Sequence, residues 1–375
     1  TKMQYMFRSA TAFNQPVQAW DVGQITNMQE MFRSARAFNQ PVAEWDVGQV
    51  TNMQSMFNSA TAFNQPLAAW DVGQITSMGD MFATEYDQAS AMSSCNQLLI
   101  HASFEAQAPS AWGNAFPNYG PLAGGWASAW CNTPLSPPAI PPSPPPPSPP
   151  PLSPLPPYQP GVAFGDKARL QGALYEWLAD AVDARAKHGH ISVWDVRAVT
   201  DMDELVAIDH LSVLPGDSYS YGPGADYGNW GGPALGFNED INAWNVGQVT
   251  TMERMFYRAR DFNQPLAAWD LGQVTNMKGM FEKARFFNQP VAAWDVGQVV
   301  NMGSVFLDAS SFNQPVAAWD VGQVTNMQSM FNSATAFNQP LAAWDVGQIT
   351  SMGVRRCPRL GRMLLRTQLP SAAEG

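Results

Sequence analysis

A row of carboxylates is the feature of this chain with the clearest capacity for chemistry. An aspartate recurs in a fixed sequence context along the chain: Asp21, Asp46, Asp71, Asp195, Asp270, Asp295, Asp320 and Asp345. In stacked copies, neighbouring carboxylates ~4.8 Å apart repel unless each is paired. Each could accept hydrogen bonds from nearby turn N–H groups, or the row could bind a cation such as Ca²⁺. Asn245 interrupts the row and favours the first alternative.

Other residues that could do chemistry lack a supporting pattern. The chain has four histidines, and only His188 and His190 lie close together, where they are better explained as a helix end than as metal ligands. The glycine-rich stretch 222–236 lacks the Lys-Ser/Thr ending of a phosphate loop. We therefore expect no catalytic, cofactor-binding or metal residues, no cofactor and no enzymatic activity. Cys95 and Cys131 flank one segment and could form a disulfide, or could be two unrelated thiols.

The composition excludes some partners. The formal net charge is −11, and charged residues make up only 14% of the chain. An acidic chain lacks the clustered Lys and Arg that phosphate-backbone binding requires, so we expect no nucleic-acid partner. No run of 18 apolar residues is present, so we also expect no transmembrane segment.

A repeat of 25 residues organises most of the chain, and the segment 51–75 represents it. A fixed period of roughly 20–50 residues indicates stacked supersecondary units. Its first half places apolar residues at the i, i+3, i+4 and i+7 positions, which predicts a short helix: Met53, Met56, Phe57 and Ala60. Its second half has leucine-rich-repeat spacing, and the alternation around Trp70 predicts a short parallel strand.

Three positions of the repeat are interpreted as structural. Asn64 and Asn313 follow the marker Phe of their copies and are expected to form an internal asparagine ladder rather than a ligand site. Each tryptophan is expected to stack on the tryptophan of the next turn, and a recurring glycine suggests a turn that a side chain would obstruct. Their representatives are Trp70, Trp319, Gly73 and Gly322.

The predicted fold is an α/β repeat solenoid, leucine-rich-repeat-like, with one short strand and one short helix per turn, in two arrays joined by a proline-rich linker. Array A spans 1–82 and is followed by a C-terminal cap at 83–132 and a polyproline II linker at 133–161. An N-terminal helical cap and first repeat span 162–205, with one helix expected over 164–190. An insertion or degenerate repeat follows at 206–236, and array B spans 237–353.

The ends of the chain depart from the repeat. Thr1 lies in mid-repeat, in register with Thr26, which suggests an N-terminal truncation that would hide any signal peptide. Residues 354–375 form an arginine-rich, non-repeat tail, which we interpret as the product of a frameshift or a misplaced gene boundary.

The repeat units, such as FNQPLAAWDVGQVTNMQSMF, resemble the BspA-like surface-protein repeat, also called the mycoplasma lipoprotein-type repeat. The resemblance implies a secreted or cell-surface protein that mediates adhesion or contacts with a protein or extracellular-matrix partner, and it supplies no catalytic residues. The proline tract resembles the Ser-Pro modules of plant and algal wall glycoproteins, which implies hydroxylation, glycosylation and secretion. The alternative is an unmodified linker or an SH3-type ligand. A structural wall component without a dedicated ligand, or a calcium-stabilised array, are the other hypotheses.

Overall fold

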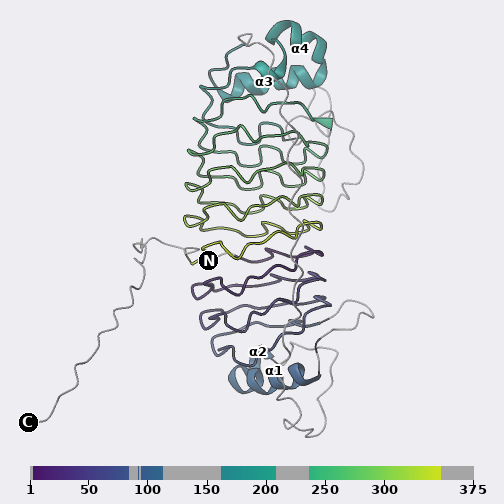
Figure 1. Cartoon of the computed structure of the whole chain (residues 1–375), viewed down its shortest axis with the longest axis vertical. Helices are drawn as coiled ribbons and strands as arrows, with labels where there is room; N and C mark the ends of the chain where they lie inside the picture. Colours follow the sequence, from purple (N-terminus) through teal and green to yellow (C-terminus); the bar gives the residue numbers. More distant parts are fainter. Residues whose placement is uncertain (1–2, 84–91, 93, 113–161, 208–235, 348–375) are drawn as a thin grey trace, which may run out of the picture.

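The computed structural model describes residues 3–83, 92, 94–112, 162–207 and 236–347. They form one elongated stack of 25-residue turns, here called the column, with a helical segment at each end (Figure 1). Two helices cover one end, α3 (Lys167–Ala179) and α4 (Ala181–His188), followed by the short 3₁₀ helix η2 (Ile191–Val193). At the other end lie α1 (Ser94–Gln107) and α2 (Pro109–Trp112).

The prediction of an α/β, leucine-rich-repeat-like solenoid is wrong. Residues 3–83 and 237–347 contain neither a helix nor an extended strand. Turns are instead joined by isolated parallel bridges, one residue per turn: Asn27 to Asn52 to Ser77 in array A, and Asp201 to Thr251, Asn276, Asn301 and Asn326 in array B. The described helices all lie outside the arrays.

The expected helix fails because the segment 53–60 bends at two residues with left-handed backbone. Ser55 and Ser59 have φ of 54° and 57°. Between them, hydrogen bonds alternate in direction. The Met56 N–H donates to the Met53 carbonyl at 3.1 Å, whereas the Phe57 N–H donates to the Met81 carbonyl of the next turn at 2.9 Å. All four side chains of the predicted apolar stripe are buried. The backbone that carries them is a series of tight local turns rather than a helix.

The expected strand is also absent, although the predicted alternation of buried and exposed side chains is correct. Trp70 and Val72 are buried and Asp71 is exposed. The Trp70 N–H donates to the Leu67 carbonyl at 3.0 Å, and the Ile75 N–H donates to the Val72 carbonyl at 3.0 Å. These bonds close local turns, so the backbone N–H groups are unavailable for a sheet ladder.

Aromatic side chains fill the column. Phe57 stacks on Phe63 of its own turn with ring centroids 4.0 Å apart, and on Phe82 of the next turn at 5.8 Å. Parallel stacks of this kind run through both arrays, and their rings are almost fully buried. Each ring contributes apolar area that is removed from water, at about 25 cal/mol per Å².

The two arrays are not held apart. The first turn of array A packs against the last described turn of array B, so residues from the two ends of the sequence lie side by side in the middle of the column (Figure 1). Phe7 stacks on Phe331 at 5.8 Å and Phe13 stacks on Phe337 at 6.1 Å. We call this contact the junction.

The caps pack on the end turns through specific contacts. Phe104 of α1 stacks on Trp70 with centroids 6.5 Å apart, and Asn96 donates to the Asn64 carbonyl at 3.1 Å. The helix expected over 164–190 is two helices, because the Asp180 carboxylate accepts the Val182 and Asp183 N–H groups and starts α4. Asp166 caps the start of α3 by accepting the Arg169 N–H at 2.9 Å.

The turns that flank the segment 206–236 contact each other directly. Trp194 stacks directly on Trp244 with centroids 6.3 Å apart, and the Met202 N–H donates to the Thr251 carbonyl at 3.0 Å. The turns before and after this segment are therefore neighbours in the column. Residues 208–235 themselves lie outside the described part.

Candidate functional site: a charged and aromatic face of the column

The aspartate row is engaged by the backbone of its own turns. In each repeat the carboxylate accepts the N–H of the glycine two residues later, at 3.1 Å for Asp71 and Gly73 and 3.0 Å for Asp320 and Gly322. The same bond forms at Asp21, Asp46, Asp270, Asp295 and Asp345. Asn245 makes it too, at 3.2 Å to Gly247, so a charge is not needed.

The glycine of this motif is pressed against the carboxylate. A Cβ at Gly322 would lie 3.2 Å from Asp320 Oδ1, and one at Gly73 would lie 3.3 Å from Asp71 Oδ1. At Asp195 the equivalent residue is Arg197, whose guanidinium pairs with that carboxylate at 2.6 Å. Among the described residues, no group of three or more His, Cys, Asp or Glu side chains is placed to hold a metal ion.

The asparagines form a ladder along the column. The Asn64 N–H donates to Asn39 Oδ1 at 2.8 Å, and the Asn338 N–H donates to Asn313 Oδ1 at 2.9 Å. The following glutamine of each turn adds a second donor, as Gln339 does to Asn313 Oδ1 at 3.0 Å. These amides are therefore occupied by the neighbouring turns.

The tryptophans also tie turns together by a bond that the sequence analysis missed. The Trp70 Nε1–H donates to the Val42 carbonyl at 3.0 Å, and Trp319 makes the same bond to Val291 at 2.9 Å. A recurring apolar residue three positions before each tryptophan was the only available signal, and it does not specify this geometry.

Two other predicted sites have different outcomes. His188 bonds to Glu176 at 3.0 Å and His190 to Ser192 at 2.8 Å, so each takes part in local helix-end contacts. The hydrogen bond from His188 lowers the pKa of the Glu176 carboxyl. The Cys95–Cys131 pairing lies outside the part of the chain whose side chains are described.

The chemically varied side chains gather on the face that carries the left-handed residues. We call this the left-handed face and define it as residues 5–9, 30–34, 55–59, 254–258, 279–283, 304–308 and 329–333. Array A contributes an ion pair between Arg33 and Glu30 at 3.1 Å, and Arg8 approaches the same Glu30 at 3.3 Å. Serine holds both left-handed positions in two of these turns, at Ser55 and Ser59 and at Ser329 and Ser333.

Array B places a cluster of cations around one aromatic ring, here called the Tyr257 cluster. The guanidinium carbons of Arg254 and Arg258 lie 5.3 and 5.1 Å from the Tyr257 centroid, and Lys283 Nζ lies 5.9 Å from it. Beside this cluster, Arg260 lies 5.6 Å from the ring of Phe286, a side chain that is 48% exposed. Cation–π contacts of this kind are worth about 0.5–1 kcal/mol at exposed sites.

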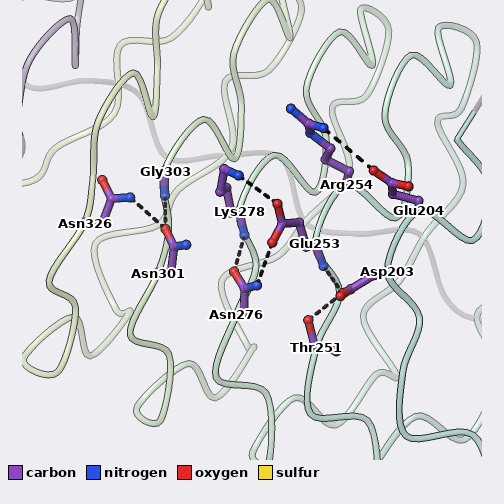
Figure 2. A network of polar contacts seen from close by, with 10 residues as sticks. All are labelled: Asp203, Glu204, Thr251, Glu253, Arg254, Asn276, Lys278, Asn301, Gly303 and Asn326. Atoms are coloured by element: carbon purple, nitrogen blue, oxygen red, sulfur yellow. Dashed lines mark hydrogen bonds and ion pairs between the residues drawn. The ribbon is translucent and has the colours of Figure 1, made fainter. Parts of the chain in front are cut away.

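Arg254 of the Tyr257 cluster lies beside a network of polar contacts on neighbouring turns (Figure 2). Lys278 pairs with Glu253 at 2.7 Å and Arg254 approaches Glu204 at 3.7 Å. The network continues along the bridge residues, where Asn326 donates to Asn301 Oδ1 at 3.0 Å. It holds Lys278 and Arg254 against carboxylates of the preceding turns.

The carboxyls of this region differ in protonation behaviour. Burial raises the pKa of Glu282, and it outweighs the opposing effect of Arg254 and Lys283. Burial likewise raises the pKa of Asp203, against hydrogen bonds from Thr251 and the Glu253 N–H. At Glu253 burial also opposes ionisation, but hydrogen bonds from Lys278 and Asn276 prevail and the pKa is lowered.

The repeat defines the class of protein. Residues 1–95, 178–289 and 265–355 match the family described as "Mycoplasma protein of unknown function, DUF285". The match covers more than half of the chain, and the chain therefore belongs to this family of repeat proteins. Comparison with curated proteins and with solved structures found no match. No helix among the described residues is long and apolar enough to cross a membrane.

Proposed function

We propose that this chain is a non-catalytic, BspA-like scaffold of a secreted or cell-surface protein, and that it mediates adhesion through contacts with a protein or extracellular-matrix partner. The observation that carries the proposal is that the regular rows of side chains and the varied side chains have different roles. The Phe, Trp, Asn and Asp rows make packing contacts and hydrogen bonds between or within turns, whereas the varied side chains lie on the left-handed face.

The Tyr257 cluster is the part of that face best suited to a protein partner. Tyrosine and arginine dominate the residues that carry binding energy in protein interfaces. Here the surrounding contacts already order the long cationic side chains, which reduces the entropy lost on binding. Three turns contribute to the cluster and its border, so the surface is broader than one repeat.

The test uses variants in which residues of the Tyr257 cluster are replaced by those found at the equivalent positions of a turn without the cluster. Tyr257→Asn, Arg258→Ser and Lys283→Ser introduce the residues that Asn332 and Ser333 supply at the equivalent positions of another turn. The triple variant should therefore keep the column. A matched control replaces three exposed glutamines near the aspartate row, Gln273, Gln298 and Gln323, by serine.

The measurement is saturable binding of the full chain to immobilised extracellular-matrix proteins and adhesion of coated beads to cells. The triple variant should lose at least about tenfold in affinity, a factor that corresponds to about 1.4 kcal/mol, and the glutamine control should stay within about twofold. Equal binding by both variants would reject the Tyr257 cluster. No saturable binding by the parent chain would favour a structural wall component, an alternative supported by the near-uniform turns elsewhere.

A further inference from the structure

Two consecutive turns of array B concentrate positive charge in a chain whose formal net charge is −11. Residues 250–299 hold six of the 20 lysines and arginines of the chain, whereas residues 300–347 hold none. The six are Arg254, Arg258, Arg260, Lys278, Lys283 and Arg285. A local excess of this kind in an acidic protein favours an anionic group on the partner.

Only some of these cations are neutralised by the column itself. Lys278 and Arg254 are paired with carboxylates of the preceding turns, at 2.7 and 3.7 Å (Figure 2). Arg260, Lys283 and Arg285 form no ion pair among the residues that the structure describes. Their charges are therefore available to a partner.

The available cations and two aromatic rings alternate across the boundary between two neighbouring turns. The Phe286 N–H donates to the Arg260 carbonyl at 3.1 Å, and the Arg260 guanidinium carbon lies 5.6 Å from the Phe286 ring. Lys283 reaches the other way, with its Nζ 5.9 Å from the Tyr257 ring. We call Tyr257, Arg260, Lys283, Arg285 and Phe286 the two-turn patch. Because Arg260 and Lys283 already lie against rings, less side-chain entropy is lost when they bind a ligand.

Carboxylates within and beside the patch limit its positive field. Asp261 follows Arg260 directly, and Asp308 occupies the position of Lys283 one turn later. Such a mixed surface suits a ligand with a few anionic groups better than a dense polyanion, whose many charges would also meet these carboxylates.

The patch also exposes an apolar ring. Phe286 is 48% exposed, and it is the only exposed Phe, Trp or Tyr side chain among the described residues. The equivalent residue of a later turn is Ala336, so the column does not need an aromatic side chain at this position. Covering this ring removes apolar area from water, which requires an apolar group on the ligand. A peptide can supply an apolar side chain between carboxylates, whereas a sulfated glycan cannot.

We propose that the two-turn patch binds an acidic segment of the partner protein, in which carboxylates flank an aromatic or aliphatic side chain. The inference rests on the proposed function, because it takes the partner to be a protein. The carboxylates pair with Arg260, Lys283 and Arg285, whose planar or multiple N–H donors suit carboxylate oxygens. The apolar side chain covers Phe286.

The test measures binding of the full chain to labelled peptides by fluorescence anisotropy. The probe repeats Glu-Glu-Phe, and two companion peptides repeat Gln-Gln-Phe and Glu-Glu-Ser, which remove the charge or the aromatic side chain. A heparin fragment of similar length represents a sulfated glycan. We expect the Glu-Glu-Phe peptide to bind saturably, and each companion to bind at least about fivefold more weakly. Between about 10 mM and about 1 M salt its affinity should fall at least tenfold, because the screening length falls from ~30 Å to ~3 Å.

Variants that carry residues of other turns locate the binding. Threonine holds the position of Arg260 and Arg285 in a later turn, at Thr335, so Arg260→Thr/Arg285→Thr should keep the column. This double variant should lose at least about tenfold in affinity for the Glu-Glu-Phe peptide at low salt. The matched control is Arg36→Thr, which removes an exposed arginine from the same position of a turn in array A and should stay within about twofold.

Phe286→Ala tests the apolar part of the patch, and Ala336 shows that the repeat accepts alanine there. It should reduce binding of the Glu-Glu-Phe peptide to the level of the Glu-Glu-Ser peptide, and leave binding of the latter within about twofold. Equal binding of the Glu-Glu-Phe peptide by this variant and the parent would overturn the role of the ring.

Three further results would overturn the inference: no saturable binding of the Glu-Glu-Phe peptide, equal losses in Arg36→Thr and in the double arginine variant, or tighter binding of heparin than of the peptide. The proposed function is judged separately. If matrix proteins bind through the Tyr257 cluster but the peptide neither binds nor competes, the function stands and the acidic segment is wrong. If the peptide binds but no matrix protein does, the patch stands and the adhesive function is wrong.

Discussion

At the scale of single residues, the tryptophan of each turn does more than fill space. Its ring is buried, and its Nε1–H reaches a carbonyl 28 residues earlier in the sequence, as from Trp45 to Val17 at 3.1 Å. One side chain therefore supplies both apolar burial and a specific bond between turns, and it adds a second donor to a carbonyl that already accepts the Trp20 N–H at 3.1 Å.

Trp45→Phe tests this bond. The smaller ring keeps part of the stacking but removes one of the two donors to the Val17 carbonyl, which still accepts the Trp20 N–H at 3.1 Å. Together with the lost ring volume, we expect a loss of about 1–3 kcal/mol in the free energy of unfolding. Chemical denaturation followed by circular dichroism measures it. An unchanged midpoint would show that the indole bond does not contribute.

The aspartate row is expected to be indifferent to calcium, because each carboxylate already accepts a turn N–H. Asp320→Asn should unfold within about 0.5 kcal/mol of the parent, as Asn245 makes the same bond, whereas Asp320→Ala should cost about 1 kcal/mol. The melting temperature should be the same in EDTA and in millimolar Ca²⁺. If Ca²⁺ raised the melting temperature of the parent but not that of Asp320→Asn, the hypothesis of a calcium-stabilised array would be restored.

Glu282 makes a pH-dependent contribution of defined sign. Because its pKa is raised in the folded state, ionisation at neutral pH disfavours folding, and this penalty disappears as the pH falls through the folded pKa toward the unfolded value of about 4.3. Glu282→Gln should therefore raise the melting temperature at pH 7 and have little effect below about pH 4. A stabilisation of equal size at both pH values would contradict this origin.

At the scale of the element, the repeat is a run of turns whose direction depends on two left-handed residues. Most of these positions hold non-glycine residues, among them Ser304 with φ of 60° and Ser329 with φ of 59°, and Gly279 takes the equivalent place with φ of 63°. The left-handed region costs an L-residue roughly 1 kcal/mol, which the bonds between turns offset.

Substitution at Ser304 separates backbone preference from packing. Ser304→Gly should change stability little or raise it by up to about 1 kcal/mol, because glycine adopts this conformation freely, whereas Ser304→Val should cost about 1–2 kcal/mol. Thermal unfolding of both variants measures the difference. Equal stabilities would mean that the segment can return to a right-handed conformation in solution.

At the scale of the whole molecule, the junction makes the two arrays neighbours in one stack. In such a stack each turn contacts mainly its neighbours, so stability is approximately a sum of turn and interface contributions. The junction carries the same bonds as any other interface and should couple the unfolding of array A to that of array B.

Trp20→Phe tests this coupling, with Trp45→Phe as the matched variant inside array A. Both lose one indole bond, to Leu341 and to Val17 respectively. We expect Trp20→Phe to broaden the thermal transition seen by calorimetry, or to divide it in two, because it weakens the contact between the arrays. Trp45→Phe should lower the temperature of the transition without dividing it. The reverse pattern would show that the arrays unfold independently of the junction.

Much of the molecule follows from the sequence alone. The 25-residue period, the buried Phe, Trp and Met positions, and the exposed aspartates follow from spacing, because burial depends on which residues recur on one side of each turn. The spacing did not predict that Arg254, Arg258 and Lys283 meet around Tyr257, since Arg258 and Lys283 lie in different repeats, 25 residues apart.

The tertiary structure decided the rest. The spacing of Met53, Met56, Phe57 and Ala60 fits a helix and a chain of alternating turns equally well, and only bonds to the neighbouring turn, such as Phe57 to Met81, favour the turns. The joining of array B to array A was likewise beyond sequence reasoning, because every repeat presents the same face. Which copies become neighbours depends on contacts in space rather than on order along the chain.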